Sequence, residues 1–265
     1  MKTPPTSEGS NIIISTRHNE QPLITNQTLR NTFFRFKQFT IHQDQAAMKV
    51  CTDACVLGAW ANVTKAKRIL DIGTGTGLLA LMLAQRLPGA HIDAVEIDTA
   101  SATQARQNVS ESPFAEAITV IESSIQDFTT DYPYDLIISN PPFFQNSLRS
   151  PDNKRNRAAH DEQLSLGELA AVAQKLLAPR GTFTVLLPPY ESGLLENECQ
   201  KVNLFLTCQL TLRHSPKKTP FRLIRSYQKT SSNQSIEKEV LCIQDENGQY
   251  TPDFVTLLQA YYLIF

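Results

Sequence analysis

The chain has 265 residues, of which 41% are hydrophobic and 19% are charged, and its net charge is −1. This composition is ordinary for a globular protein with one sizeable core. No apolar run approaches the length of about 20 residues that spans a bilayer, and the near-neutral charge excludes a globally basic nucleic-acid binder but not a basic patch. The five cysteines contain no Cys-x-x-Cys pair, so we expect reduced thiols in a cytoplasmic protein and no bound metal.

The hydrophobic pattern predicts alternating strands and helices after a polar segment. Residues 1–30 are rich in Thr, Ser, Asn and Pro, which predicts a flexible tail, and residues 31–265 are predicted to form a single domain. Strands are expected at 67–72, 92–97, 118–122, 136–139, 182–187, 204–212 and 222–228, with a further candidate at 240–244, and helices at 78–87, 101–110, 164–177 and 254–263. This order predicts an α/β, doubly wound, mostly parallel sheet of seven strands with helices on both faces, a Rossmann-like fold whose last strand pair is antiparallel.

A glycine-rich turn follows the first predicted strand, with the sequence Asp71-Ile72-Gly73-Thr74-Gly75-Thr76-Gly77. Glycine lets the backbone turn sharply and approach a ligand closely, and open parallel sheets bind ligands at the carboxyl ends of their strands. The dinucleotide pattern Gly-x-Gly-x-x-Gly would need glycine at Leu78, so the spacing disfavours that reading. A purely structural turn is the alternative. Glu96 ends the next strand, where a carboxylate can accept hydrogen bonds from both ribose hydroxyls, although NAD enzymes also carry an acid there.

The most informative tetrapeptide is Asn140-Pro141-Pro142-Phe143, which ends the apolar run Leu136-Ile137-Ile138. Neither proline can donate to a strand ladder, so the strand stops there. What remains is an amide side chain, a rigid turn with free carbonyls, and an aromatic ring. Such a group can hold a planar amino group by its two N–H donors while stacking on the attached ring. The motif resembles the catalytic Asn-Pro-Pro-aromatic signature of S-adenosylmethionine-dependent amino methyltransferases, and this resemblance implies an adenine, a cytosine or a glutamine amide as substrate. A strand merely ended by two prolines is the alternative.

Several motifs together resemble one enzyme family. They are, in chain order, Phe36-Lys37-Gln38-Phe39, Met48-Lys49-Val50-Cys51-Thr52-Asp53, Gly58-Ala59-Trp60, Asp71–Gly77 and Asn140–Phe143. This order resembles the bacterial tRNA adenine-N6 methyltransferases, which are class I S-adenosylmethionine-dependent enzymes that modify the adenosine immediately 3′ of the anticodon in a valine tRNA. The resemblance runs from about residue 32 to residue 263. It implies the class I methyltransferase fold, S-adenosylmethionine as the methyl-donating cofactor with S-adenosylhomocysteine as product, and tRNA as partner.

The resemblance also implies roles for individual residues. Asn140 and the Pro141 carbonyl would accept the two N–H bonds of the adenine amine, and Phe143 would stack on the base. Cys51 and Ala54 stand where we would expect glycines, which leaves the geometry of that cofactor-capping segment (31–65) open. The implied cofactor-binding residues are Asp71, Gly73, Thr74, Gly75, Gly77, Glu96, Asp127, Asn140, Lys49 and Thr52.

Two basic stretches are candidates for binding RNA. Phosphate contacts by such clusters are independent of sequence and sensitive to salt. Ordinary solvated surface is the alternative for each cation taken alone. The first stretch contains Arg149, Lys154, Arg155 and Arg157, and the second, which lacks acids, contains Arg213, Lys217, Lys218, Arg222, Arg225 and Lys229.

Three other functions fit parts of the sequence. A protein glutamine N5-methyltransferase also uses Asn-Pro-Pro-aromatic, and an rRNA guanine-N2 methyltransferase would act on a similar amine. A non-enzymatic RNA-binding module could retain a vestigial cofactor fold, although the intact Asn140 and Asp71 argue against this. The leading hypothesis remains methylation of adenosine N6 in tRNA by a monomer that binds neither membrane nor DNA.

Overall fold

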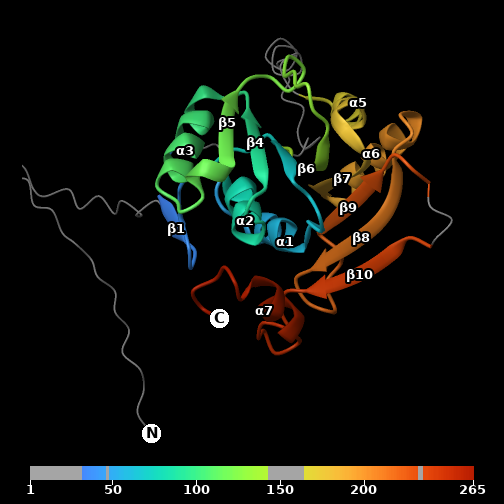
Figure 1. Cartoon of the computed structure of the whole chain (residues 1–265). Helices are drawn as coiled ribbons and strands as arrows, with labels where there is room; N and C mark the ends of the chain where they lie inside the picture. Colours follow the sequence, from blue (N-terminus) through green and yellow to red (C-terminus); the bar gives the residue numbers. More distant parts are fainter. Residues whose placement is uncertain (1–31, 46–47, 143–163, 232–234) are drawn as a thin grey trace, which may run out of the picture. The chain divides into compact units, whose positions relative to one another are not determined.

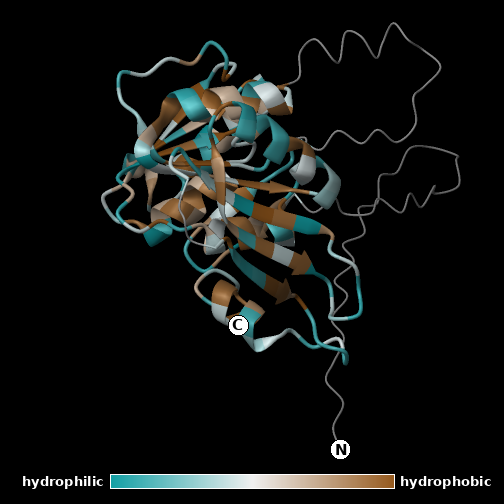
Figure 2. Ribbon diagram, turned by 90° about the vertical axis from the view of Figure 1, so that its right-hand side faces the viewer, coloured by the Kyte–Doolittle hydropathy of each residue, from teal (hydrophilic) through white to brown (hydrophobic). Residues whose placement is uncertain are grey.

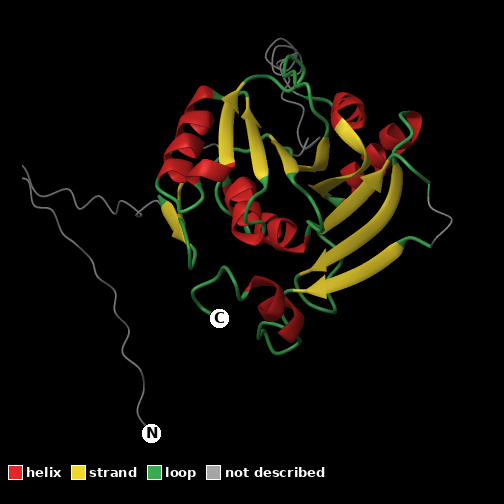
Figure 3. Cartoon of the chain, viewed as in Figure 1, coloured by secondary structure: helices red, strands yellow, loops and turns green. Residues whose placement is uncertain are grey.

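The computed structural model describes residues 32–45, 48–142, 164–231 and 235–265 (Figure 1). The predicted tail, residues 1–30, lies outside these ranges, so its boundary stays a prediction. The described residues form a central mixed sheet with helices packed against it (Figure 3). This arrangement confirms the predicted α/β class.

The sheet has eight strands in the described part of the chain, in the order β10-β8-β9-β7-β6-β3-β4-β5 (Figure 1). Their bounds are β3 Arg68–Ile72, β4 His91–Glu96, β5 Ile118–Glu122, β6 Tyr134–Ser139, β7 Leu177–Leu187, β8 Phe205–Arg213, β9 Arg222–Gln228 and β10 Glu237–Cys242. The five strands from β7 to β5 are mutually parallel. Because parallel strands end at the same edge, the carboxyl ends of β3, β4 and β6 lie side by side.

The C-terminal strands differ in one respect from the prediction. Strand β9 pairs antiparallel with both β7 and β8, which confirms the antiparallel pair. Strand β10 then pairs parallel with β8 and adds an eighth strand to the seven predicted. It covers Glu237–Cys242 rather than 240–244, and four of its six residues are exposed. An edge strand with so little buried surface gives a weak hydrophobic pattern, which explains the misplaced start.

Two of the helices were not predicted. Helix α1 is buried on nearly every side, from Asp53 to Ala59, so it has no polar face from which a helical period could be recognised. In helix α6 the apolar residues Tyr190 and Leu194 are exposed, so apolar residues are not confined to one face and the helical period of the sequence is obscured. The helices are α1 Thr52–Trp60, α2 Leu78–Arg86, α3 Thr99–Ser110, α5 Leu166–Leu176, α6 Pro189–Lys201 and α7 Pro252–Leu258, with a 3₁₀ turn at Ala115–Ala117. None of the helices in these ranges has both the length and the apolar character of a transmembrane span.

The sheet separates two hydrophobic clusters, and Figure 2 shows hydrophobic residues concentrated along its central strands. Alternating side chains of one strand reach opposite faces, as Ile69 and Leu70 of β3 do. The first cluster is completed by α1, α2 and α7, and the second by α5 and α6. A strand buried on both faces is held rigidly, so the side chains at its end start from a fixed position.

A small hairpin precedes the main sheet, formed by β1 (Phe33–Arg35) and β2 (Thr40–His42). From β2 the chain runs back along α3. The His42 N–H donates to Asn108 Oδ1 at 2.8 Å, and the Gln45 N–H donates to Gln104 Oε1 at 3.1 Å. These bonds guide the segment toward the carboxyl edge of the sheet, where α1 begins.

Candidate active site

A cavity of about 260 Å³ opens at the carboxyl edge of the sheet. Its walls come from the ends of β3, β4 and β6 and from the loop after β5, within residues 72–75, 95–98, 123–126 and 139–142. The predicted glycine turn, Glu96 and Asn140 therefore meet around one cavity although they are far apart in the sequence. Open parallel sheets bind their ligands at this edge.

The glycine turn borders the cavity with bare backbone. Gly73 has φ +70° and Gly75 has φ +57°, a left-handed conformation that favours glycine. A Cβ atom at either position would have no neighbour within 4 Å among the residues that the structure describes, so open space lies beside the backbone there. Gly77 is different, because a Cβ there would contact Ala105 Cβ at 3.6 Å. It packs against α3 rather than bordering the cavity.

Asp71 holds this turn from inside the protein. Its side chain is fully buried, and its Oδ2 accepts a hydrogen bond of 2.6 Å from Thr74 Oγ1. Burial raises the pKa of Asp71 to about 7, and the nearby negative charge of Glu96 adds to this effect. Among the described residues, neither Asp71 nor Thr74 lines the cavity. Their direct contact with a cofactor stays a prediction, whereas their role in fixing the turn is plain.

Glu96 lies in the cavity wall with a fixed orientation. Its Oε2 accepts the Gly75 N–H at 2.8 Å, and its Oε1 accepts the Asp98 N–H at 3.0 Å. Each carboxylate oxygen keeps a further lone pair for a ligand. A ribose could therefore use the same carboxylate that orients the glycine turn.

Asn140 presents an unused acceptor at the same place. Its Oδ1 is buried and has no hydrogen-bond partner among the described residues. The preceding residue is anchored, because Ser139 Oγ donates to the Ile72 carbonyl at 2.9 Å. Leaving a buried acceptor unpaired costs about 1–3 kcal/mol. An amino group entering the cavity would remove that cost, so the site fits a ligand with an N–H donor.

The comparisons with known proteins agree with this geometry. The methyltransferase small domain family matches residues 54–189. A tRNA1(Val) (adenine(37)-N6)-methyltransferase from Dyadobacter fermentans is 48% identical over 238 residues, which are 89% of this chain and 99% of that relative. The chain belongs to this methyltransferase family.

Two solved structures share the fold of this methyltransferase. A predicted O-methyltransferase from Agrobacterium tumefaciens gives a TM-score of 0.62 at 17% identity, over 78% of this chain and 96% of that one. The glycopeptide N-methyltransferase MtfA, complexed with (S)-adenosyl-L-methionine, gives 0.52 at 11% identity, over 68% and 94%. The predicted Rossmann-like methyltransferase fold is thus confirmed.

In the predicted cofactor-capping segment, the residue that lines the cavity differs from those predicted to bind the cofactor. Met48 lines the cavity. Lys49 and Thr52 are exposed and, in the described structure, are not part of its wall. The motif does lie beside the cavity, but its sequence does not indicate which of its side chains lines the wall. Their cofactor contacts stay predictions.

In the loop after β5, the residue that lines the cavity is again not the predicted one but its neighbour in the sequence. Asp127 Oδ2 accepts a hydrogen bond of 2.7 Å from Ser124 Oγ, as a turn carboxylate does. The neighbouring Gln126 lines the cavity. The predicted bond from Asp127 to the cofactor adenine stays a prediction, and Gln126 is a candidate that its position beside Asp127 could have suggested.

Five predicted site residues lie outside the described residues. They are Phe143 of the Asn-Pro-Pro-Phe motif and the first basic stretch, Arg149, Lys154, Arg155 and Arg157. Base stacking by Phe143 and phosphate contacts by the four cations stay predictions.

In the second basic stretch, two arginines are engaged inside the protein. Arg222 Nε lies 2.8 Å from Asp53 Oδ2, which joins β9 to the buried start of α1. Arg225 is only 13% exposed; it pairs with Glu196 of α6 at 2.8 Å and donates to Gln209 Oε1. These bonds give both arginines a structural role, and their RNA contacts stay predictions.

Two other cations of this stretch are more accessible than the arginines. Lys217 and Lys218 are exposed in the loop after β8, and Lys217 meets Glu246 at 3.1 Å in a pair that water screens. Arg213 and Lys229 are half-buried at the ends of their strands. If this stretch binds phosphate, the two loop lysines are the best placed to do so.

Proposed function

We propose that this methyltransferase transfers the methyl group of S-adenosylmethionine to the exocyclic N6 of an adenosine in tRNA, the one 3′ of the anticodon in a valine tRNA. The name of the relative from Dyadobacter fermentans supports this substrate. The structural observation that carries the proposal is the buried Asn140 Oδ1, an acceptor that has no partner among the described residues and lies beside the glycine turn and Glu96.

The residues present fit the cofactor. The bare backbone at Gly73 and Gly75 leaves room for a ligand, and the oriented carboxylate of Glu96 suits two ribose hydroxyls. When bound, S-adenosylmethionine supplies a methyl group that its sulfonium already activates. The protein therefore needs to bind and orient the acceptor.

The acceptor amine needs help from the protein. The lone pair of adenine N6 is delocalised into the ring, so the nitrogen is a poor nucleophile. Asn140 Oδ1 and the Pro141 carbonyl would accept its two N–H bonds, which favours a pyramidal nitrogen with its lone pair aimed along one line. The rigid Pro-Pro turn and the anchored Ser139 hold these acceptors still. Such positioning can supply a large part of the lowering of the barrier.

The substrate is expected to be a loop rather than a duplex. The target base must leave any stack to enter the cavity, and an unpaired base leaves at lower cost. Exposed Lys217 and Lys218 would contact the RNA backbone. We propose that the enzyme acts in the cytoplasm as a monomer, since one chain supplies every group named above.

The test is methyl transfer from labelled S-adenosylmethionine into total RNA from cells that lack this enzyme, followed by nucleoside analysis. We expect N6-methyladenosine in a single valine tRNA. Label in a protein fraction would instead indicate that a glutamine amide is the substrate. Label in guanosine of ribosomal RNA would indicate methylation of guanine N2. No S-adenosylmethionine binding in an equilibrium titration would leave only an RNA-binding module.

A further inference from the structure

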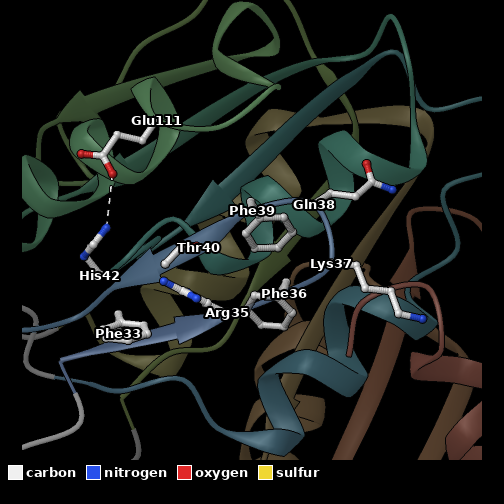
Figure 4. A pocket seen from close by; sticks show the side chains of 9 residues that line it. All are labelled: Phe33, Arg35, Phe36, Lys37, Gln38, Phe39, Thr40, His42 and Glu111. Atoms are coloured by element: carbon white, nitrogen blue, oxygen red, sulfur yellow. Dashed lines mark ion pairs between the residues drawn. The ribbon is translucent and has the colours of Figure 1, made fainter. Parts of the chain in front are cut away.

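A second concave site of about 460 Å³ lies at the β1–β2 hairpin (Figure 4). The motif Phe36-Lys37-Gln38-Phe39 forms part of its lining, and the proposed reaction gives this motif no role. The Phe36 N–H donates to the Phe39 carbonyl at 2.8 Å and closes the turn, while the two buried rings stack at 4.6 Å. The phenylalanines therefore fix the shape of the hairpin rather than contact a ligand.

The open face of the hairpin combines a cation with an aromatic ring. Its register pairs Phe33 with His42 and Arg35 with Thr40, so these four side chains share one face (Figure 4). Phe33 is 43% exposed, and the Arg35 guanidinium lies 5.4 Å from the centre of its ring. Arg35 makes no ion pair with any residue that the structure describes. Its charge is thus available to a ligand and is already held over an apolar surface.

The other charges around the site leave it able to take an anion. Lys37 Nζ donates to the Gln259 and Phe265 carbonyls at 2.6 and 2.9 Å, which ties the hairpin to the C-terminal segment. Glu111 is the acid in the lining, and His42 Nε2 engages it at 3.2 Å (Figure 4). Arg35 therefore carries the positive charge of the site that no described residue neutralises.

Helix α3 connects this site to the catalytic cavity. Ser101 in its first turn lines the catalytic cavity, and Glu111 at its end lines the hairpin site. Ten residues of α-helix separate them, which corresponds to about 15 Å. Nucleotides in one strand of duplex DNA advance by roughly 3.4 Å each, and with a similar rise in RNA this distance spans about four to five of them.

We propose that the hairpin site binds the sugar-phosphate backbone of the stem that closes the tRNA loop, four to five nucleotides from the methylated base. Arg35 contacts a phosphate there, and Phe33 packs against the adjoining ribose. This inference rests on the proposed function, because it assumes that an RNA loop enters the catalytic cavity. It assigns the hairpin a role in RNA affinity and none in the chemical step.

The test compares Arg35→Glu with the control Arg180→Glu, which reverses one exposed arginine at the start of β7. Two substrates are used, the complete tRNA and a shortened hairpin that keeps the loop but whose stem ends before the nucleotides four to five positions from the methylated base. With tRNA, Arg35→Glu should raise Kd and KM about five- to tenfold and lower the salt slope by about 1, with kcat unchanged. With the shortened hairpin it should behave as the wild type, and so should Arg180→Glu with both substrates.

Phe33→Ala provides a second variant that keeps the charge, and it should weaken tRNA binding but leave the salt slope intact. Equal behaviour of Arg35→Glu and Arg180→Glu on tRNA, or an equal loss on both substrates, would overturn the inference. If the wild type methylates no RNA, the proposed function itself fails. Thermal unfolding of each variant separates loss of binding from loss of the fold.

Discussion

Replacing Gly75 by alanine should weaken S-adenosylmethionine binding far more than it weakens the fold. Gly75 has φ +57° and borders the cavity, and no atom of the described residues lies within 4 Å of the position that a Cβ would take. The added methyl group therefore contacts no atom in the described part of the chain. It projects into the space that the cofactor needs.

The magnitudes follow from this geometry. Holding alanine in the left-handed region costs about 1–2 kcal/mol, which is the expected loss in the free energy of unfolding. A methyl group that intrudes on a bound ligand costs about 1–3 kcal/mol more, so cofactor affinity should fall by roughly 5- to 150-fold. Gly89→Ala is the matched control. Gly89 has φ +88° and also lacks neighbours, but it precedes the amino end of β4, at the opposite end of that strand from the cavity.

Calorimetric titration with S-adenosylmethionine and urea unfolding measure the two quantities. We expect both variants to lose similar stability and only Gly75→Ala to lose cofactor affinity. If Gly75→Ala binds as tightly as the wild type, the cavity is not the cofactor site. If both variants lose cofactor affinity equally, the loss reflects reduced stability, and the inference that the space beside Gly75 holds the cofactor is refuted.

The remaining predictions concern the cavity and the second basic stretch. Asn140→Ala should lower kcat by roughly 100- to 1,000-fold in single-turnover assays with cofactor affinity retained; normal methylation would remove Asn140 from the chemistry. The pKa of Asp71 is raised from 3.8 to about 7, so the wild type should lose stability as pH rises through that window. The unfolding free energy of Asp71→Asn relative to the wild type should increase there and level off above it; a constant difference would contradict the raised pKa. Lys218→Glu should weaken tRNA binding and flatten its salt dependence without loss of stability. Arg222→Met should cost about 3 kcal/mol in urea unfolding, because it leaves Asp53 buried and unpaired; an unchanged transition would refute its structural role.

Local patterns in the amino-acid sequence determine much of the fold. Strands β5 and β9 have the bounds that the sequence predicted, and most other elements differ by a few residues. The elements that were missed have no local signature. Helix α1 is buried on nearly every side, and in α6 the exposed Tyr190 and Leu194 obscure the helical period. The predicted strand at 182–187 was found, but it begins earlier, at Leu177.

For the candidate site, the sequence determined the motifs whose chemistry is local. The glycine turn needs its residue types because of its own backbone angles, and Asn140 ends a strand because two prolines follow it. Such features are fixed by neighbours in the chain. They can therefore be recognised without knowing what packs against them.

Only the tertiary structure decided which charged side chains are free to bind a ligand and which are paired within the protein. Arg222 looked like an RNA-binding cation, but its partner Asp53 is 169 residues away in the sequence. Arg225 likewise meets Glu196 from another element. An ion pair depends on which elements pack together, and no local pattern records that. The same packing turned Met48 toward the cavity and left Arg35 over Phe33, unpaired among the described residues, on the face of the hairpin.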